Sequence, residues 1–197
     1  RLTFNSTINQ RLLKQKYEEL ARLDPMTGVF NRSALATDLP RIVAEGSVAI
    51  HAIDLDHFKA ANDRFGHPVG DALLKQVADR LTRLAGEGDL VVRMGGDEFI
   101  LVQRGAASCG DAEAVAKRIY DVVTAPYEVA GHDIVIGVSI GIALAPNDVT
   151  SSEMLLLRSD RALYQAKSFR GGYVFAGDLP AAAEAPERAS AVRPHAA

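Results

Sequence analysis

The spacing of apolar residues along the chain predicts alternating helices and strands. Apolar positions three and four residues apart predict amphipathic helices over residues 8–23, 32–45, 71–84, 111–124 and 151–168. Apolar runs predict strands over residues 47–55 and 173–175, a hairpin over 90–103, and a second hairpin from 126–130 and 134–144. A short helix is expected at 57–65 and a loop at 66–70. Because hairpins interrupt the alternation, we expect an α+β fold with helices layered on a central mixed, antiparallel-rich sheet.

The two ends of the chain differ from its middle. Residues 1–23 contain the helical pattern over 8–23 but no adjoining strand, so we interpret them as a stalk helix that leads into the domain. A coiled coil with a second copy and a helix packed back on the domain both remain open. Residues 24–176 carry the alternating pattern. Ala, Pro, Glu and Arg dominate residues 177–197, which we expect to be a disordered tail.

One predicted strand has two unequal faces. Over residues 134–144, bulky aliphatic side chains occupy one set of alternate positions, and the other set is mostly small: Val135, Gly137, Ser139, Gly141 and Ala143. A helix or a ligand can approach such a small face closely.

The composition is that of a soluble globular domain. Of the 197 residues, 48% are apolar and 24% are charged. The net charge of −3 argues against a nucleic-acid binder, which normally carries a basic face. The single cysteine, Cys109, excludes an internal disulfide and suits a reducing cytoplasm. No run of 18 apolar residues is present, so we expect no membrane contact within this segment, although a chain that begins at Arg1 can be part of a membrane-anchored protein.

Acidic residues at two predicted strand ends are the first candidate chemistry. Gly95-Gly96 predicts a tight turn in the 90–103 hairpin, with Asp97 and Glu98 just after it. Asp54 lies at the carboxyl end of the buried strand 47–55, and we expect it to face Asp97 across a gap that fits Mg²⁺, with the Leu55 carbonyl as a further ligand. Turn acids in solvent are the alternative. In a plain strand Glu98 would point away from Asp97, so its role depends on the turn.

Polar residues around the predicted loop 66–70 can recognise a base. The amide of Asn62 offers a donor and an acceptor, and the carboxylate of Asp71 can accept from the N–H groups on the guanine edge. Asp71 could instead be a helix N-cap. Lys59 and Lys167 could hold phosphates, or simply be solvated on a helix surface.

Several spaced segments resemble the GGDEF family of diguanylate cyclases over about residues 22–176. The matching segments are 24–28 (DPMTG), Asn31-Arg32, 52–59 (AIDLDHFK), Asn62-Asp63, Gly66-His67, Gly70-Asp71, 93–99 (RMGGDEF) and 162–167 (ALYQAK). The resemblance implies a nucleotidyl-cyclase or palm-like fold. It also implies that two GTP molecules condense to cyclic di-GMP, with one GTP held by each subunit of a homodimer.

The resemblance also implies roles for individual residues. Asp54, the Leu55 carbonyl, Asp97 and Glu98 would bind Mg²⁺, for which Mn²⁺ can substitute, and Asp97 and Glu98 would be catalytic. The nucleotide would be held by Asn62, Asp71, His67, Phe58, Lys59, Lys167, Gly95 and Gly96. The homodimer would form through the stalk helix and the catalytic faces, under an upstream sensor or regulatory domain.

Two departures from the family pattern change what we expect. Members with product inhibition carry Arg-x-x-Asp before the Gly-Gly pair, and here Gly86 replaces the arginine while Asp89 is retained. We therefore expect no tight feedback site. The usual Gly-Arg-Asn after the last helix is replaced by 169–172 (FRGG), which leaves the role of Arg170 open. The alternative to an active cyclase is a catalytically silent binding module for GTP or cyclic di-GMP.

Overall fold

The computed structural model describes residues 21–169 and 171–179. Within them, a six-stranded sheet has the strand order β1-β3-β4-β2-β7-β8, and β5 and β6 pair in a separate small sheet. The strands are β1 (Phe30–Asn31), β2 (Val48–Asp56), β3 (Leu90–Gly95), β4 (Glu98–Arg104), β5 (Tyr127–Val129), β6 (His132–Ile134), β7 (Gly137–Ala145) and β8 (Gly172–Phe175). The pairs β1–β3 and β7–β8 are parallel and the others antiparallel, as expected for a mixed, antiparallel-rich sheet.

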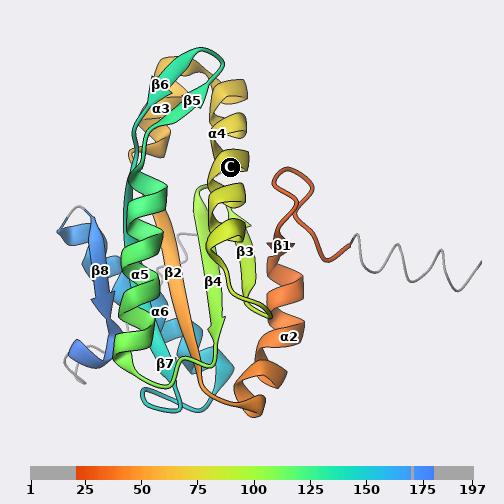
Figure 1. Cartoon of the computed structure of the whole chain (residues 1–197), viewed down its shortest axis with the longest axis vertical. Coiled ribbons are helices and arrows are strands. Elements are labelled where there is room, and N and C mark those ends of the chain that lie inside the picture. Colours follow the sequence, from red (N-terminus) through yellow and green to blue (C-terminus); the bar gives the residue numbers. More distant parts are fainter. Residues whose placement is uncertain (1–20, 170, 180–197) are drawn as a thin grey trace, which may run out of the picture.

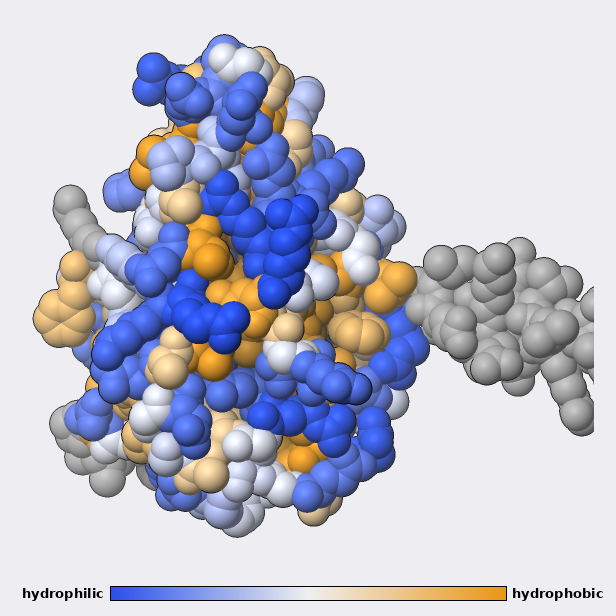
Figure 2. Space-filling view, in the orientation of Figure 1, coloured by the Kyte–Doolittle hydropathy of each residue, from blue (hydrophilic) through white to orange (hydrophobic). Residues whose placement is uncertain are grey.

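Helices cover both faces of the large sheet (Figure 1). One core cluster joins the sheet to α3 (Phe58–Phe65), α4 (His67–Leu84) and α5 (Cys109–Thr124). The second joins the opposite face to α2 (Arg32–Glu45) and α6 (Ser152–Ser168). The outer surface of the α4–α5 layer is mostly hydrophilic (Figure 2), because each amphipathic helix turns one apolar stripe inward. The predicted layered α+β architecture is confirmed.

Strand β2 lies at the centre of the large sheet. It pairs antiparallel with β4 on one side and with β7 on the other. Both faces of β2 are covered by helices, and every residue from Val48 to Leu55 is buried, which explains its near-continuous apolar run. Asp54 is a charged residue within this mainly apolar run, and it lies at the carboxyl end of the strand.

A close contact between β7 and α6 fixes the position of that helix. A Cβ atom on Gly141 would lie 2.1 Å from both the backbone nitrogen of Leu163 and the carbonyl oxygen of Ser159. No side chain fits there, so the small face predicted for this strand is where α6 packs. Because α6 ends at Ser168, this contact also sets the place of Lys167 beside the sheet.

The start of α4 differs from the prediction. The segment 66–70 was expected to be a loop, but α4 begins at His67, with Gly66 at its N-cap and a proline, Pro68, in its first turn. Proline favours the first helical turn, where its missing N–H is not needed. Asp71 therefore lies inside the helix rather than at its N-cap, and the capping interpretation of Asp71 is wrong.

The strand predicted over 134–144 is also different, because it is two strands. β6 ends at Ile134 and pairs only with β5, whereas β7 begins at Gly137 and joins the large sheet. Unbroken alternation of apolar residues cannot reveal this change of partner, since both strands bury the same side-chain type.

The predicted ends of the domain are only partly within the described residues. The stalk helix over 8–23 lies outside them except for its last three residues, which form a turn and a bridge between Leu23 and Phe30 rather than a helix. At the other end, a 3-10 helix covers Ala176–Asp178, and Leu179 packs on the α2–α6 core. Residues 176–179 thus pack on the described fold, and residues 180–197 are outside the described part.

The buried imidazole of His51 makes stability depend on pH. His51 lies in β2 with 0% exposure, its Nε2 is 2.9 Å from Gln103 Oε1, and its Nδ1 has no partner among the described residues. Burial lowers the pKa of His51 from 6.5 to about 4, against the opposing effects of Gln103 and Asp89. His51 is therefore protonated near pH 6.5 in the unfolded chain but only near pH 4 in the folded chain. The free energy of unfolding consequently decreases as the pH falls from 6.5 to 4.

We expect His51→Leu to flatten this pH dependence. Between pH 7.5 and 4.5, urea unfolding should show that the native chain loses about 2 to 3 kcal/mol more than the variant. His132, which is exposed, provides the control: His132→Gln should keep the native slope. Equal slopes for native chain and His51→Leu would contradict the assignment.

Candidate active site

The turn between β3 and β4 consists of Gly96 and Asp97. Gly95 has a φ of 140° and Gly96 a φ of 54°, both of which glycine adopts without steric cost. The N–H of Leu55 donates a hydrogen bond to the carbonyl of Asp97 over 3.3 Å, which ties the turn to the end of β2. The expectation that this hairpin lies beside the Asp54 strand is confirmed, with Asp54 directly opposite Glu98 in the register.

Two carboxylates and one lysine meet at this end of the sheet. Asp54 is only 8% exposed, and its Oδ2 lies 2.7 Å from Nζ of Lys167 on α6. Partial burial acts to lower the pKa of Lys167, but the hydrogen bond and charge of Asp54, with the charges of Glu98 and Asp97, raise it overall. Burial and then the charge of Asp54 raise the pKa of Asp97. The site therefore holds concentrated negative charge that one ammonium only partly offsets.

A pocket of about 450 Å³ opens over these groups. It is lined by Asp54, Leu55, Asp56, His57, Phe58, Lys59, Asp97 and Lys167. The structure thus brings together six predicted site residues from β2, α3, the hairpin turn and α6, which are far apart in sequence. Gly95, at the end of β3, and Gly96, in the turn, adjoin the pocket through Asp97.

The N-terminus of α3 lies at this pocket. Its N-cap residue, His57, has a left-handed φ of 65° and makes no side-chain cap. The first N–H groups of a helix have no partner within the helix, so those of Phe58 and Lys59 can donate to an anion. A non-glycine residue with positive φ is strained, and such strain often occurs at functional sites.

Asp56 and His57 line the pocket although sequence reasoning did not place them in the site. The Oγ of Ser139 donates to both carboxylate oxygens of Asp56, over 2.9 and 3.1 Å. The two-residue spacing of Asp54 and Asp56 could have indicated this, because alternate residues of a strand share one face.

Glu98 lines a different hollow from the pocket that Asp97 lines. It lies at the edge of a second groove of about 460 Å³ between α2, α6 and the sheet, whose lining is mainly apolar and includes Leu35, Ile100 and Leu157. Asp97 belongs to the turn and lines the first pocket, whereas Glu98 begins β4 and is exposed. Asp97 and Glu98 therefore line different hollows, although the strand register sets Glu98 opposite Asp54.

The predicted base-reading residues lie further along the helices. Asn62 is on α3, while His67 and Asp71 are exposed in the first turns of α4. None of them lines the pocket at Asp54. Helices α3 and α4 pack against each other, which places Asn62 against the backbone at Gly70, next to Asp71.

The donor groups fit a hard divalent cation. Among residues 21–169 and 171–179, no three His, Cys, Asp or Glu side chains form a ready metal cluster. Asp54 and Asp97 nevertheless supply two carboxylates in one pocket, and the Leu55 carbonyl is nearby. Mg²⁺ commonly uses one or two carboxylates and completes its shell with water and substrate phosphate. Burial, and then the charge of Asp54, raise the pKa of Asp97, and a cation bound between the two carboxylates would offset both effects.

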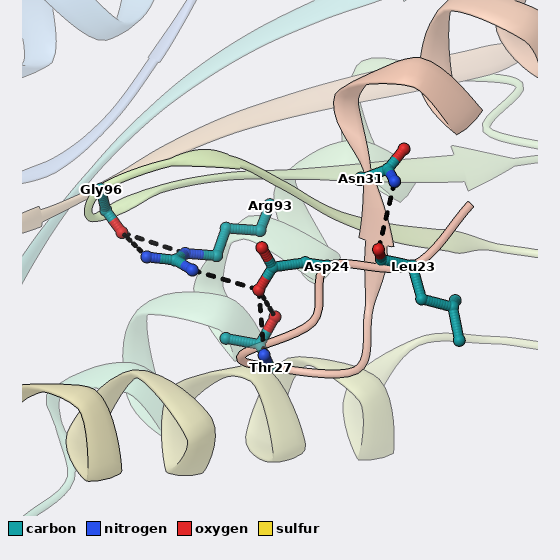
Figure 3. A network of polar contacts seen from close by, with 6 residues as sticks. All are labelled: Leu23, Asp24, Thr27, Asn31, Arg93 and Gly96. Atoms are coloured by element: carbon teal, nitrogen blue, oxygen red, sulfur yellow. Dashed lines mark hydrogen bonds and ion pairs between the residues drawn. The ribbon is translucent and has the colours of Figure 1, made fainter. Parts of the chain in front are cut away.

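A buried arginine connects the hairpin turn to the start of the domain (Figure 3). Arg93 is 9% exposed and donates from Nε and Nη2 to the Gly96 carbonyl, over 3.1 and 2.8 Å. Its Nη1 lies 3.1 Å from Oδ1 of Asp24, which also accepts from the N–H and hydroxyl of Thr27. Burial acts to raise the pKa of Asp24, but the Thr27 and Arg93 contacts lower it overall. Sequence reasoning missed this link between residues 24 and 96.

Comparison with known proteins decides the family. A model described as "Diguanylate cyclase, GGDEF domain" matches residues 21–171. The chain belongs to this family. An uncharacterised signalling protein of Caulobacter vibrioides is 42% identical to this GGDEF domain over 84% of the chain and 21% of its own length. Diguanylate cyclase DgcP of Escherichia coli is 33% identical over 82% of the chain and 48% of its own length.

Solved structures share the fold of this GGDEF domain. The GGDEF domain of YfiN from Pseudomonas aeruginosa superimposes with a TM-score of 0.75 at 35% identity, covering 78% of this chain and 94% of that one. The coiled coil and GGDEF domain of DgcB from Caulobacter crescentus, in complex with c-di-GMP, also has a TM-score of 0.75, at 26% identity and over 87% and 95% of the two chains. The chain spans only a fifth to a half of the curated relatives named above. None of the helices in the described part has the length and hydrophobicity needed to cross a membrane.

We expect Asp24→Ala to destabilise this GGDEF domain by about 2 to 3 kcal/mol, because it leaves the buried Arg93 guanidinium without its counter-ion. Urea unfolding at neutral pH measures the change. Arg41→Ala is the control, because Arg41 and Glu45 form an exposed pair on α2, and its effect should stay within about 0.5 kcal/mol. Similar losses in the two variants would show that the Asp24–Arg93 link is not a stabilising interaction.

Proposed function

We propose that this GGDEF domain is an active diguanylate cyclase. In the proposed reaction, two GTP molecules condense to cyclic di-GMP and two pyrophosphates, as each 3′-hydroxyl attacks the α-phosphate of the other GTP. The meeting of Asp54, Asp97 and Lys167 in one pocket carries the proposal. Attack in line at a phosphate needs positioning and charge neutralisation more than covalent help, and these groups supply both.

Asp54, the Leu55 carbonyl and Asp97 would hold Mg²⁺, or Mn²⁺ in its place. Bound there, the ion supplies charge neutralisation at the reacting phosphate. Lys167 pairs with Asp54 and lines the pocket, where its ammonium would also contact phosphate oxygens. Lys59 and the free N–H groups at the start of α3 would bind the remaining phosphates.

The nucleoside would extend from the pocket along α3. Asn62 lies four residues after Phe58, which is about 6 Å along the helix axis. The base would thus meet Asn62 and Asp71 while the triphosphate stays in the pocket, with His67 at the edge of the base site. This separation explains why the base-reading residues do not line the pocket at Asp54.

Each subunit would hold one GTP, so a homodimer completes the reaction. Glu98 is exposed beside Asp54 and would assist removal of the 3′-hydroxyl proton or complete the metal site. The stalk segment over residues 1–23 and the catalytic faces would bring two copies together, under an upstream regulatory domain. We place the domain in the cytoplasm, where GTP is available, either free or as part of a membrane-anchored protein.

One relative supports a second candidate function. NbdA of Pseudomonas aeruginosa, which is 33% identical over 85% of this chain, is described as a cyclic di-GMP phosphodiesterase. A domain of this family can therefore be part of a protein named for another activity. A catalytically silent module that binds GTP or cyclic di-GMP is the corresponding alternative, and incubation with GTP and Mg²⁺ under forced dimerisation separates the two. Absence of cyclic di-GMP there would favour the binding module.

Asp54→Ala and Asp97→Ala should each abolish turnover, because either change removes one of two carboxylates from the metal site. Chromatographic detection of cyclic di-GMP measures the loss, which should exceed about a hundredfold in rate. Circular dichroism should show that the fold is kept. Near-normal activity of Asp54→Ala would refute the metal assignment.

Asn62→Ala and Asp71→Ala are the matched comparison on α3 and α4. These variants should mainly weaken GTP binding, by about tenfold, and reduce its preference over ATP, because each loses hydrogen bonds to the base. Turnover at saturating GTP should fall far less than in the carboxylate variants.

The turn at residues 86–89 should bind cyclic di-GMP only weakly. Both oxygens of Asp89 are already used, by the N–H groups of Gly86 and Arg104 at 2.8 Å each. Gly86→Arg should increase cyclic di-GMP affinity by calorimetry, because it adds the guanidinium that the turn lacks. Gly86→Ala is the control. Unchanged affinity in Gly86→Arg would show that this turn is not equivalent to the family's inhibitory site.

A further inference from the structure

Gly70 on α4 faces the side-chain amide of Asn62 on α3 at very short range. A Cβ atom on Gly70 would lie 1.7 Å from Oδ1 and 2.8 Å from Cγ of Asn62. Atoms that are not bonded cannot approach so closely. Any side chain at residue 70 would therefore push the Asn62 amide out of its present place.

The backbone of α4 does not itself require a glycine here. Gly70 lies within the helix, and it is not among the residues with positive φ. Glycine is a poorer helix former than alanine, since it loses more conformational freedom on folding. The glycine at residue 70 thus lowers the stability of α4 itself. What it contributes is space for the Asn62 amide.

The Asn62 amide contributes little to holding the fold together. Its Oδ1 is buried against Gly70 and has no hydrogen-bond partner within the described residues. A buried acceptor without a partner costs stability. Because Oδ1 is turned towards Gly70, the Nδ2 donors are the part of the amide that is left for a ligand.

We propose that Gly70 is a positioning residue for purine selection: by lacking a side chain, it lets the Asn62 amide sit beside Asp71 in the orientation that recognises guanine. This inference rests on the proposed function. The Asp71 carboxylate accepts from two adjacent N–H groups, which guanine offers and adenine does not, while Asn62 Nδ2 donates to an acceptor on the same base. Recognition thus needs the carboxylate and the amide at fixed relative positions, and any side chain at residue 70 would displace the amide.

Gly70→Ala should weaken binding of guanosine 5′-(α,β-methylene)triphosphate about tenfold, the loss expected for one well-placed hydrogen bond. Binding of the matching adenosine analogue should change little, so the selectivity falls. With GTP as substrate, KM should rise while kcat changes less. The matched control is Gly110→Ala on α5, where the nearest atom to a new Cβ is Ser108 Oγ at 3.6 Å, and it should leave all of these unchanged.

A double-mutant cycle separates positioning from a general structural role. In an Asn62→Ala background the amide is absent, so Gly70→Ala should cost no further GTP-analogue affinity and should raise the melting temperature, because alanine favours the helix. This double variant is expected to fold even if Gly70→Ala alone does not. Additive losses of affinity, or equal losses for the guanosine and adenosine analogues, would overturn the inference.

The outcomes also distinguish this inference from the proposed function. If the native chain fails to bind the guanosine analogue, the proposed function fails. If Asn62→Ala weakens binding and Gly70→Ala does not, the proposed function stands and the role of Gly70 is refuted.

Discussion

The antiparallel pairing of β2 with β4 is the constraint on which the candidate site depends. It sets Asp54 opposite Glu98 and brings the hairpin turn to the end of β2, where the Leu55 N–H holds the Asp97 carbonyl. A shift of one residue in this register would turn Asp54 to the other face of the sheet. The helices on both faces prevent such a shift, because each face of β2 is packed in its own core.

Electrostatic repulsion and packing oppose each other at the carboxyl end of β2. Asp54 is nearly buried beside Asp97, which is unfavourable for two negative charges, and Lys167 relieves only part of the repulsion. The position of that lysine depends on the close approach of α6 to Gly141. On the other side of the turn, Arg93 holds the Gly96 carbonyl and Asp24. The acidic pocket is thus held by contacts from both ends of the described chain.

Most elements follow from local sequence, and the errors have identifiable causes. The apolar run of β2 and the Gly-Gly turn predict a central strand and a hairpin, and both are present. The start of α4 was missed because the glycines around His67 and Pro68 resemble a loop, although proline also suits a first helical turn. The break between β6 and β7 was missed because alternation does not report which strand is the partner. Asp56 and His57 were missed because the roles expected of this segment had already been assigned to their neighbours Asp54, Leu55, Phe58 and Lys59.

The sequence by itself determined the family, the layered fold and the residue types at the site, because these depend on spacing within short segments. The tertiary structure decided which of those residues meet. It places Asp54, Asp97 and Lys167 in one pocket, sets Glu98 opposite Asp54 at the edge of a second groove, and sets Asn62 against Gly70 on neighbouring helices. These relations join residues that are distant in sequence or depend on a turn angle, and only the packing of helices on a registered sheet fixes them.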